Sequence, residues 1–242
     1  MADRPIITSE QVKPLFESKF IKVYDLQYEE GRHYYDATRR NVEDLVAIKS
    51  DEEFRQMLPD AVTCVVILKR KGEEPVLLLT KEYRYPTGQF LLSPPAGLMD
   101  PEDVYAQSPI LETAKREIKE ETGLDIKDGD YMEVINPLLF STPGMTDESN
   151  ALALAVIHVD NFDDLNTSGA VGSEKFDGFV FVNKKEARSI IQKGRDDKDV
   201  FFSVYTWAVL MYFLSDMWDK KDKDYLKYSA EPEVGDCGCI YG

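Results

Sequence analysis

Apolar residues along the chain gather into short runs that are separated by polar, turn-forming segments. Five runs have the length of a strand and span residues 61–68, 75–80, 131–140, 151–160 and 178–182. Because a strand covered on both faces needs apolar side chains at nearly every position, the first two runs predict adjacent buried strands, joined by a polar turn. The core of the protein is predicted to begin there, and the later runs add further strands.

The first sixty residues carry a different pattern. Residues 20–28 partly alternate apolar and polar side chains, residues 31–40 follow after a turn, and residues 51–58 begin with acidic side chains ahead of a short apolar pattern. These features predict two strands in a hairpin-like arrangement and one or two turns of helix. Residues 1–60 form a predicted N-terminal β region that is too small to be stable alone, so we expect it to pack on the main domain or on a second subunit.

The C-terminal part of the main domain is predicted to be helical. Residues 184–194 suit a short helix that stops at Gly194, and residues 200–218 are densely apolar. The uninterrupted part of the second segment is shorter than the roughly 20 residues of a membrane span, so it predicts a buried helix that could also meet a partner subunit. The main domain is expected to span residues 61–219. The charge-rich tail 220–242 has little means of packing, and poor order is expected there.

Composition and charge narrow the classes of partner. The chain has 242 residues, of which 43% are hydrophobic and 31% charged, and its formal net charge is −16. One medium-sized domain with an appendage fits this length, and the charge argues against binding to nucleic acid or to an anionic membrane. A phosphorylated small molecule remains possible if divalent cations mediate the contact. The first residues have no apolar stretch of the signal-peptide type, so a cytoplasmic protein is expected.

The three cysteines agree with a cytosolic protein. Cys64 lies within an apolar run and is predicted to be a small buried hydrophobe. Cys237 and Cys239 lie in the tail at a spacing that could hold a thiophilic metal or a redox pair, although no histidine is nearby. The alternative is a tail that happens to carry two thiols.

Three glutamates within residues 116–124 are the strongest candidates for chemistry. In a helix, Glu117 and Glu121 lie one turn apart on the same face, and Glu120 adjoins both. Carboxylates about 5 to 6 Å apart repel by about 3 kcal/mol per pair at an effective dielectric constant of about 20, so a partly buried cluster needs a cation. Mg²⁺, or Mn²⁺ in its place, suits such hard oxygen ligands. On a fully solvated helix the repulsion is much weaker, and an acidic wet surface is the alternative.

The segment before this helix predicts a backbone contact to a bound ion. Pro94 and Pro95 make a stiff turn, and Gly97 follows Ala96 with no side chain. Backbone carbonyls at this point can therefore approach an ion closely. Gly123 supplies a stop at the end of the helix.

These residues together resemble the Nudix box, whose pattern is Gly, five residues, Glu, seven residues and then Arg-Glu-apolar-x-Glu-Glu-x-Gly-apolar. Residues 116–124 match the second half at every fixed position. The first half departs from the pattern, because Gly97 precedes Arg116 by 19 residues instead of 14, and the first Glu falls on Ser108. In the family that Glu helps to orient the Arg. The role is vacant here unless it is filled by one of three alternatives: Glu102, Asp103 or Glu112.

Two further segments are similar to the ADP-ribose pyrophosphatase branch of this family. Residues 83–86, Tyr-Arg-Tyr-Pro, precede residues 94–98, Pro-Pro-Ala-Gly-Leu, at a similar spacing. By this resemblance Arg84, with its permanent charge and planar donor fork, contacts a substrate phosphate; the alternative is an ion pair with Glu82 or with the acidic helix. The loop 141–150 resembles Ser-Pro-Gly-x-(Ser/Thr)-(Asp/Glu)-Glu. The resemblance implies three substrate-binding residues: Glu148, which helps to position substrate or metal, and Gly144 with Met145, which line the cleft.

The resemblance also implies a catalytic glutamate on a flexible loop after the box. Residues 161–175 have the polarity of such a loop. Glu174 is the candidate for this role, and Asp177 is the alternative.

The fold implied by the resemblance is a Nudix-type α/β/α sandwich with a mixed sheet, preceded by the small N-terminal β region. A homodimer is implied as well, with the N-terminal region reaching the partner. The implied reaction is Mg²⁺-dependent hydrolysis of a nucleoside-diphosphate compound, first of all ADP-ribose to AMP and ribose 5-phosphate. The metal ligands are then Ala96, Glu117, Glu120 and Glu121, and the catalytic residues are Glu120, Glu121 and Glu174.

Two alternatives to this reaction remain open. The first keeps the chemistry and changes the substrate to a nucleotide sugar, a dinucleoside polyphosphate or an oxidised nucleotide. The second is a non-catalytic sensor of ADP-ribose or a related ligand, which the missing first Glu of the box favours. The intact set of Glu117, Glu120 and Glu121 argues against the sensor, because binding alone does not require all three.

Overall fold

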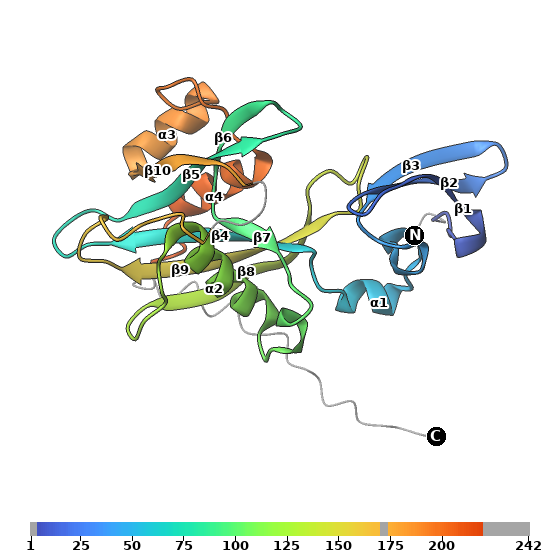
Figure 1. The fold of residues 1–242 in the computed structure, drawn as a ribbon, viewed down its shortest axis with the longest axis horizontal. Helices are drawn as coiled ribbons and strands as arrows, with labels where there is room; N and C mark the ends of the chain where they lie inside the picture. The colour runs from blue at the N-terminus through green and yellow to red at the C-terminus, as the bar shows by residue number, and fades with distance from the viewer. Residues whose placement is uncertain (1–3, 170–173, 220–242) are drawn as a thin grey trace.

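The computed structural model describes residues 4–169 and 174–219. The predictions for the tail 220–242, with Cys237 and Cys239, lie outside these residues. The described chain folds into a sandwich of helix, sheet and helix, with a smaller sheet at one side (Figure 1). The predicted α/β/α architecture with a mixed sheet and a small N-terminal β region is confirmed.

Seven strands of the described chain form the central sheet, in the order β10-β5-β4-β9-β8, with β6 paired to β5 and β7 paired to β4. Their bounds are β4 Ala61–Lys69, β5 Val76–Arg84, β6 Gln89–Ser93, β7 Ala96–Leu98, β8 Tyr131–Phe140, β9 Ser149–His158 and β10 Phe176–Val182. β4 runs parallel to β9, and the other pairs are antiparallel. The apolar pattern does not predict β6 or β7, because Pro94 and Pro95 interrupt the segment that contains them.

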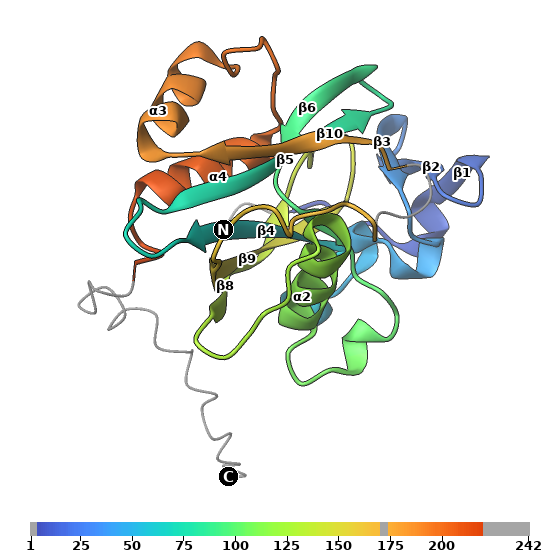
Figure 2. The ribbon, with the colours of Figure 1, turned by 60° about the vertical axis from the view of Figure 1, so that its left-hand side comes forward.

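Helices cover both faces of the central sheet (Figure 2). They are α2 Pro109–Thr122 on one face, and α3 Lys184–Lys193 with α4 Val204–Leu214 on the other. Side chains of β4 alternate between two cores, since Val65 and Ile67 pack with α3 and α4 whereas Cys64 and Val66 pack with α2. Because both faces are covered, both sets of side chains are apolar, which explains the uninterrupted run. Cys64 is fully buried, as predicted.

Flanking residues set the end of α3 and the start of α4. α3 stops at Gly194, which adopts a left-handed conformation with φ of 71°. α4 is shorter than the predicted segment 200–218, because Ser203 caps it by accepting a hydrogen bond from Thr206 N. Beyond its end, the buried Trp218 stacks on Phe213. In the described ranges, no helix is both long and apolar enough to span a bilayer.

The N-terminal region forms a three-stranded antiparallel sheet beside the sandwich (Figure 1). Its elements are β1 Val12–Glu17, β2 Lys22–Glu29, β3 Arg32–Thr38 and α1 Asp51–Gln56, with short 3-10 turns at Ser9–Gln11, Val42–Asp44 and Val46–Ile48. Val12, Tyr24, Leu26 and Leu45 make its small core. The sequence does not predict β1, because Pro14 lies in it and all its residues after Val12 are exposed.

Partly buried charged side chains join the N-terminal sheet to the sandwich of the same chain. Arg40 is 12% exposed in its side chain and pairs with Asp60 at 2.6 Å and with Asp147 at 3.1 Å. The backbone N–H of Ala37 donates to the carbonyl of Met145 at 3.0 Å. The N-terminal region is predicted to pack on the main domain or on a second subunit, and these contacts place it on the main domain. Removing one member of this partly buried set leaves its partner without a counter-charge, so the set stabilises the junction.

Asp36 on β3 is a buried carboxyl near this junction, and it makes stability depend on pH. Burial, followed by the charge of Asp147, raises its pKa from 3.8 to about 6. Between these two pH values the folded protein holds a proton that the unfolded chain has released. The stability that Asp36 contributes is therefore complete below about pH 4 and lost as the pH rises through about 6. Asp36→Asn should raise the free energy of unfolding in urea by about 1 to 2 kcal/mol near pH 7.5 and change it little near pH 4.

A matched control for this prediction is Asp44→Asn, which removes a carboxylate from an exposed turn of the same region. It should leave the free energy of unfolding within about 0.5 kcal/mol at either pH. An equal stabilisation by Asp36→Asn at both pH values would show that charge burial is not its cause.

Candidate active site

The α2 helix presents acidic side chains to the interior of the protein. Ser108 stands at its N-cap with Pro109 in the first turn, and Gly123 ends it in a left-handed conformation with φ of 75°. Glu117 and Glu121 are only 6% and 4% exposed. Their burial on one side of the helix follows from the four-residue spacing. The alternative of a solvated acidic face does not hold for these two residues.

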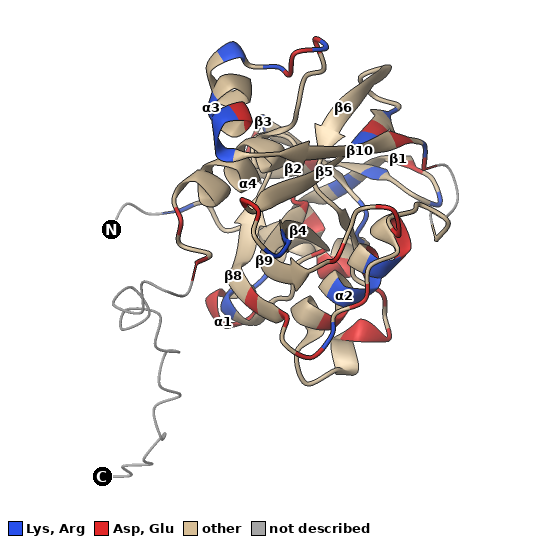
Figure 3. Ribbon diagram, turned by 90° about the vertical axis from the view of Figure 1, so that its left-hand side faces the viewer, with Lys and Arg blue, Asp and Glu red and all other residues tan. Residues whose placement is uncertain are grey.

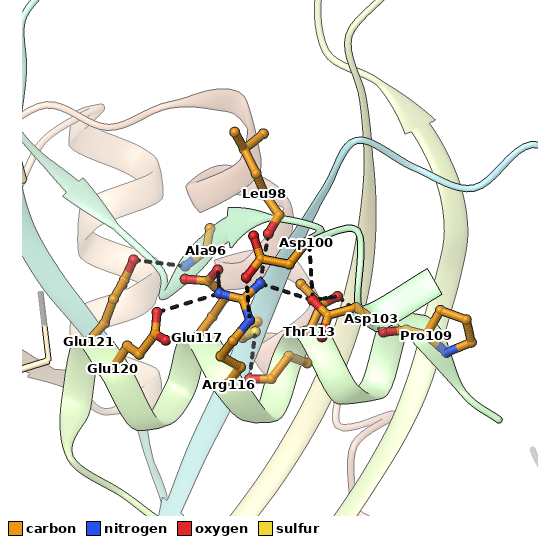
Figure 4. Close-up of polar contacts among 12 residues, drawn as sticks. Ala96, Leu98, Asp100, Asp103, Pro109, Thr113, Arg116, Glu117, Glu120 and Glu121 are labelled. Carbon is orange, nitrogen blue, oxygen red and sulfur yellow. Dashed lines mark hydrogen bonds and ion pairs between the residues drawn. The ribbon is translucent and has the colours of Figure 1, made fainter. Parts of the chain in front are cut away.

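The short strand β7 lies directly against these glutamates (Figure 4). The backbone N–H of Ala96 donates to Glu121 Oε1 at 3.5 Å. A Cβ atom added at Gly97 would lie 2.1 Å from the Glu117 carboxylate, so this carboxylate occupies the space that a side chain would need. The predicted close approach of backbone and glutamates at Ala96 and Gly97 is thus present.

Arg116 clamps the acidic face from the side (Figure 4). Its Nη1 donates to Glu117 at 2.7 Å and to Glu120 at 3.4 Å, and its Nη2 donates to the Leu98 carbonyl at 2.8 Å. The same Nη2 also donates to Asp103 Oδ2 at 3.0 Å. One guanidinium therefore fixes β7, α2 and the loop between them relative to one another.

Asp103 fills the role that the departure from the box left open. It sits in a 3-10 turn, Asp103–Tyr105, formed within the longer connection between Gly97 and Arg116. Besides Arg116, its Oδ2 accepts hydrogen bonds from Thr113 Oγ1 at 3.0 Å and from the backbone N–H of Asp100 at 3.1 Å. Glu112 instead pairs with Lys115 at 2.7 Å. Of the three alternatives, the structure brings Asp103 to the arginine.

Replacing Asp103 tests this role. Asp103→Asn keeps the shape but removes one of the charges that hold Arg116, beside Asp100 at 3.3 Å, so Glu117 is less firmly oriented. For the hydrolysis that the resemblance implies, we expect kcat/KM to fall by about 10- to 100-fold. The measurement is the rate of product release at saturating Mg²⁺, together with the Mg²⁺ concentration that gives half-maximal rate. Glu102→Gln, the neighbouring exposed alternative, is the control and should stay within about twofold; a similar loss in both variants would refute the assignment.

Burial and the charges of neighbouring carboxylates both raise the pKa values of Glu117 and Glu121. Burial, partly offset by Arg116, raises the pKa of Glu117 to about 7, and the charges of Glu120 and Glu174 add to the rise. Burial also raises the pKa of Glu121 well above its ordinary value, followed by the charges of Glu82 and Glu117. Acidic segments gather along α2 and the loop before it (Figure 3). Ionising these carboxyls together is costly unless a cation compensates them.

The donor set fits a hard divalent cation. Carboxylate oxygens from α2 and backbone carbonyls of β7 are the ligand types that Mg²⁺ prefers, and their desolvated charges need a counter-ion. Among residues 4–169 and 174–219, no group of three Asp, Glu, His or Cys side chains already stands in a metal-holding arrangement. The fit therefore rests on donor chemistry and burial.

Glu174 belongs to the same electrostatic cluster, although it comes from the segment before β10. Its charge raises the pKa of Glu117, Glu121 and Glu82. The carbonyl of the next residue, Lys175, accepts a hydrogen bond from Tyr83 N at 2.8 Å, which ties this segment to β5. Its alternative, Asp177, is exposed and pairs with Lys81 at 3.6 Å.

Glu82 is a member of the cluster that the sequence analysis did not select as a site residue. Glu82 is 9% exposed and lies on β5, two residues before Arg84. The Nη2 atom of Arg84 is 2.5 Å from the carboxylate of Glu82. The ion pair named as the alternative for Arg84 is therefore present. The available signal was an acidic residue on the inward-facing side of a strand that is otherwise apolar up to Leu79.

The three residues predicted from the loop 141–150 lie against the N-terminal sheet. Tyr34 Oη donates to the Gly144 carbonyl at 3.0 Å, Ala37 N donates to the Met145 carbonyl, and Arg39 Nε pairs with Glu148 at 3.1 Å. Met145 also lines a cavity of about 540 Å³ between this sheet and the sandwich. These described contacts do not join them to the glutamates of α2, and their role in substrate binding stays a prediction.

Comparison with known proteins gives one family match and several relatives. A model of the NUDIX domain matches residues 57–204. Putative nudix hydrolase 2 of Caenorhabditis elegans is 37% identical over 101 residues, which cover 42% of this chain and 40% of that protein. Nudix hydrolase 14, chloroplastic, of Arabidopsis thaliana is 31% identical over 117 residues, which cover 43% of this chain and 37% of that protein. The matches thus span less than half of the length of these curated relatives.

Two solved structures are also similar. The crystal structure of an ADP compounds hydrolase is 19% identical, with a TM-score of 0.47, and the match covers 90% of this chain and 93% of that one. The crystal structure of a C. elegans Ap4A hydrolase binary complex is 19% identical, with a TM-score of 0.41, and the match covers 64% of this chain and 96% of that one. At this level of similarity neither structure bears on the substrate of this chain.

Proposed function

The chain belongs to the Nudix family, and from this premise we propose that it hydrolyses a nucleoside-diphosphate compound with Mg²⁺ as its cofactor. The proposed substrate is ADP-ribose, and the products are AMP and ribose 5-phosphate. The observation that carries the proposal is the buried pair Glu117 and Glu121 on α2, packed against the side-chain-free backbone at Gly97. A protein gains nothing in stability from two desolvated carboxyls at this spacing, so a role in chemistry accounts for them better.

The residues proposed to hold Mg²⁺ are Glu117, Glu120, Glu121 and the carbonyl of Ala96. When bound, the ion supplies the counter-charge for a diphosphate and favours ionisation of water. The protein supports such binding in two ways. Arg116 fixes the side chains of Glu117 and Glu120, and the N–H of Ala96 contacts Glu121, so the ligands are oriented before the ion arrives.

Proton transfer is assigned to Glu174. Its carboxylate is exposed at the edge of the cluster, where water and substrate have access. It accepts the proton of the water that attacks phosphorus, and the bond from phosphorus to the leaving phosphate oxygen breaks. Arg84, whose side chain is 46% exposed beside the cluster, donates hydrogen bonds to a phosphate and stabilises the charge that develops there.

The choice of ADP-ribose is supported by the likeness of residues 83–86 and 94–98 to one branch of the family. A panel of ADP-ribose, UDP-glucose, diadenosine tetraphosphate and an oxidised nucleotide, incubated with Mg²⁺ and analysed by liquid chromatography, tests it. We expect AMP and ribose 5-phosphate from ADP-ribose at the highest kcat/KM. Faster cleavage of another compound would replace the substrate, and binding of ADP-ribose without cleavage of any compound would favour the sensor. A homodimer also remains part of the proposal.

A further inference from the structure

Glu82 is a buried carboxylate on β5, a strand whose earlier residues up to Leu79 are apolar. Leu78, four residues earlier on the same face of the strand, packs in the core beneath α2. Because side chains of a strand alternate between its faces, Glu82 points to the α2 side as well, at the end of that core. Backbone pairing with Leu91 on β6 and with Phe176 on β10 holds the residue from both sides. Its carboxylate is therefore buried in a fixed place near Glu121.

The carboxylate of Glu82 has two side-chain partners, the hydroxyl of Ser93 and the guanidinium of Arg84. The side chain of Glu82 is 11% exposed and that of Arg84 is 46% exposed, and the two meet at 2.5 Å. One side of the guanidinium is thus anchored in the interior while the rest of it remains open to solvent. An arginine has five N–H donors, so the anchored group keeps donors free for a phosphate.

Folding stability does not account for the Glu82–Arg84 pair. Glu82 is buried beside Glu121: the charge of Glu82 raises the pKa of Glu121, and the charge of Glu174 raises the pKa of both. An apolar side chain at this position would avoid that cost. An arginine that must face a diphosphate, on the other hand, binds it better when its orientation is set beforehand.

We infer that Glu82 is a positioning residue, which holds the guanidinium of Arg84 at the edge of the carboxylate cluster so that it meets a phosphate of the substrate. This inference rests on the proposed function, because it assigns to Arg84 the phosphate contact given above. Glu82 acts through Arg84 and is not itself a ligand of the metal or the substrate.

A double-mutant cycle tests the inference with the full-length protein. Glu82→Gln and Arg84→Gln should each lower kcat/KM for ADP-ribose by about 10- to 100-fold, and the double variant should be no slower than Arg84→Gln alone. Mn²⁺ titrated without substrate should bind wild type and Glu82→Gln with affinities within about threefold. The Nε–H resonance of Arg84 in NMR spectra should move toward that of a free arginine in Glu82→Gln.

Glu73→Gln is the control, since it breaks an Arg–Glu pair with Arg70 in the turn between β4 and β5, outside the carboxylate cluster. It should leave kcat/KM unchanged. The inference is wrong if the double variant loses kcat/KM by the product of the two single losses, or if Glu82→Gln leaves kcat/KM unchanged. A large loss of Mn²⁺ affinity in Glu82→Gln would overturn it as well, because Glu82 would then be a metal ligand. If wild type hydrolyses no compound of the panel, the proposed function fails, while the Mn²⁺ and NMR measurements still report on the Glu82–Arg84 pair.

Discussion

Glu121→Gln is expected to lower the rate of hydrolysis on the order of 10²- to 10⁴-fold without loss of the fold. Gln has nearly the same shape and still offers an oxygen to the Ala96 N–H, which lies 3.5 Å from Glu121 Oε1. It lacks the negative charge that a divalent cation requires, in a site where water cannot replace it because Glu121 is 4% exposed. Rates of AMP release from ADP-ribose at several Mg²⁺ concentrations measure the effect.

The same variant should be more thermostable than wild type in EDTA. Burial and the nearby Glu82 and Glu117 raise the pKa of Glu121, so its ionised form destabilises the metal-free protein and Gln relieves this repulsion. Glu112→Gln, an exposed change on the same helix, is the control and should change neither rate nor stability appreciably. Full activity in Glu121→Gln would remove the basis of the proposed function.

Gly97→Ala is expected to reduce activity about as strongly as removal of Glu117 itself. The added Cβ would lie 2.1 Å from the Glu117 carboxylate, so the two groups cannot both keep their places. Because the backbone of β7 is paired to β4 at this point, with Gly97 opposite Val62, the carboxylate is the group that moves. Its displacement costs about 1 to 3 kcal/mol of stability and removes one proposed ligand. Thermal unfolding and turnover, measured on the same preparations, report both effects.

Introducing Gly97→Ala into the Glu117→Ala variant separates the clash with the Glu117 carboxylate from other effects of alanine at position 97. In that background the space beside Gly97 is empty, so Gly97→Ala should cost little further stability and no further activity. If Gly97→Ala is equally harmful with and without Glu117, a distortion of β7 is responsible and the expected contact is wrong.

The sequence predicts those parts of the molecule that depend on local periodicity. The spacing of Glu117 and Glu121 gives one helical face, and apolar runs such as that of β4 give buried strands, because both signals arise within a single element. β1 escapes prediction because its side chains are exposed after Val12, so its place depends on pairing with β2 rather than on burial. Its existence is a tertiary property.

The composition of the candidate site is predicted only in part, for the same reason. Arg116 and the glutamates follow from the box, but the sequence leaves Glu102, Asp103 and Glu112 as equal alternatives for the partner of the arginine. A folded connection brings Asp103 to Arg116 at 3.0 Å, and spacing along the chain does not encode this turn. Glu82 enters the site through strand pairing with β6 and β10, which likewise joins distant segments.

The turn that carries Asp103 has a consequence for recognising related proteins. A search pattern that requires Glu eight residues before the arginine of the box would reject this chain at Ser108, although the carboxylate of Asp103 does reach Arg116. Such a pattern therefore removes chains in which the acidic partner of the arginine stands elsewhere in the connection. Patterns that accept an Asp anywhere in a lengthened connection would recover them.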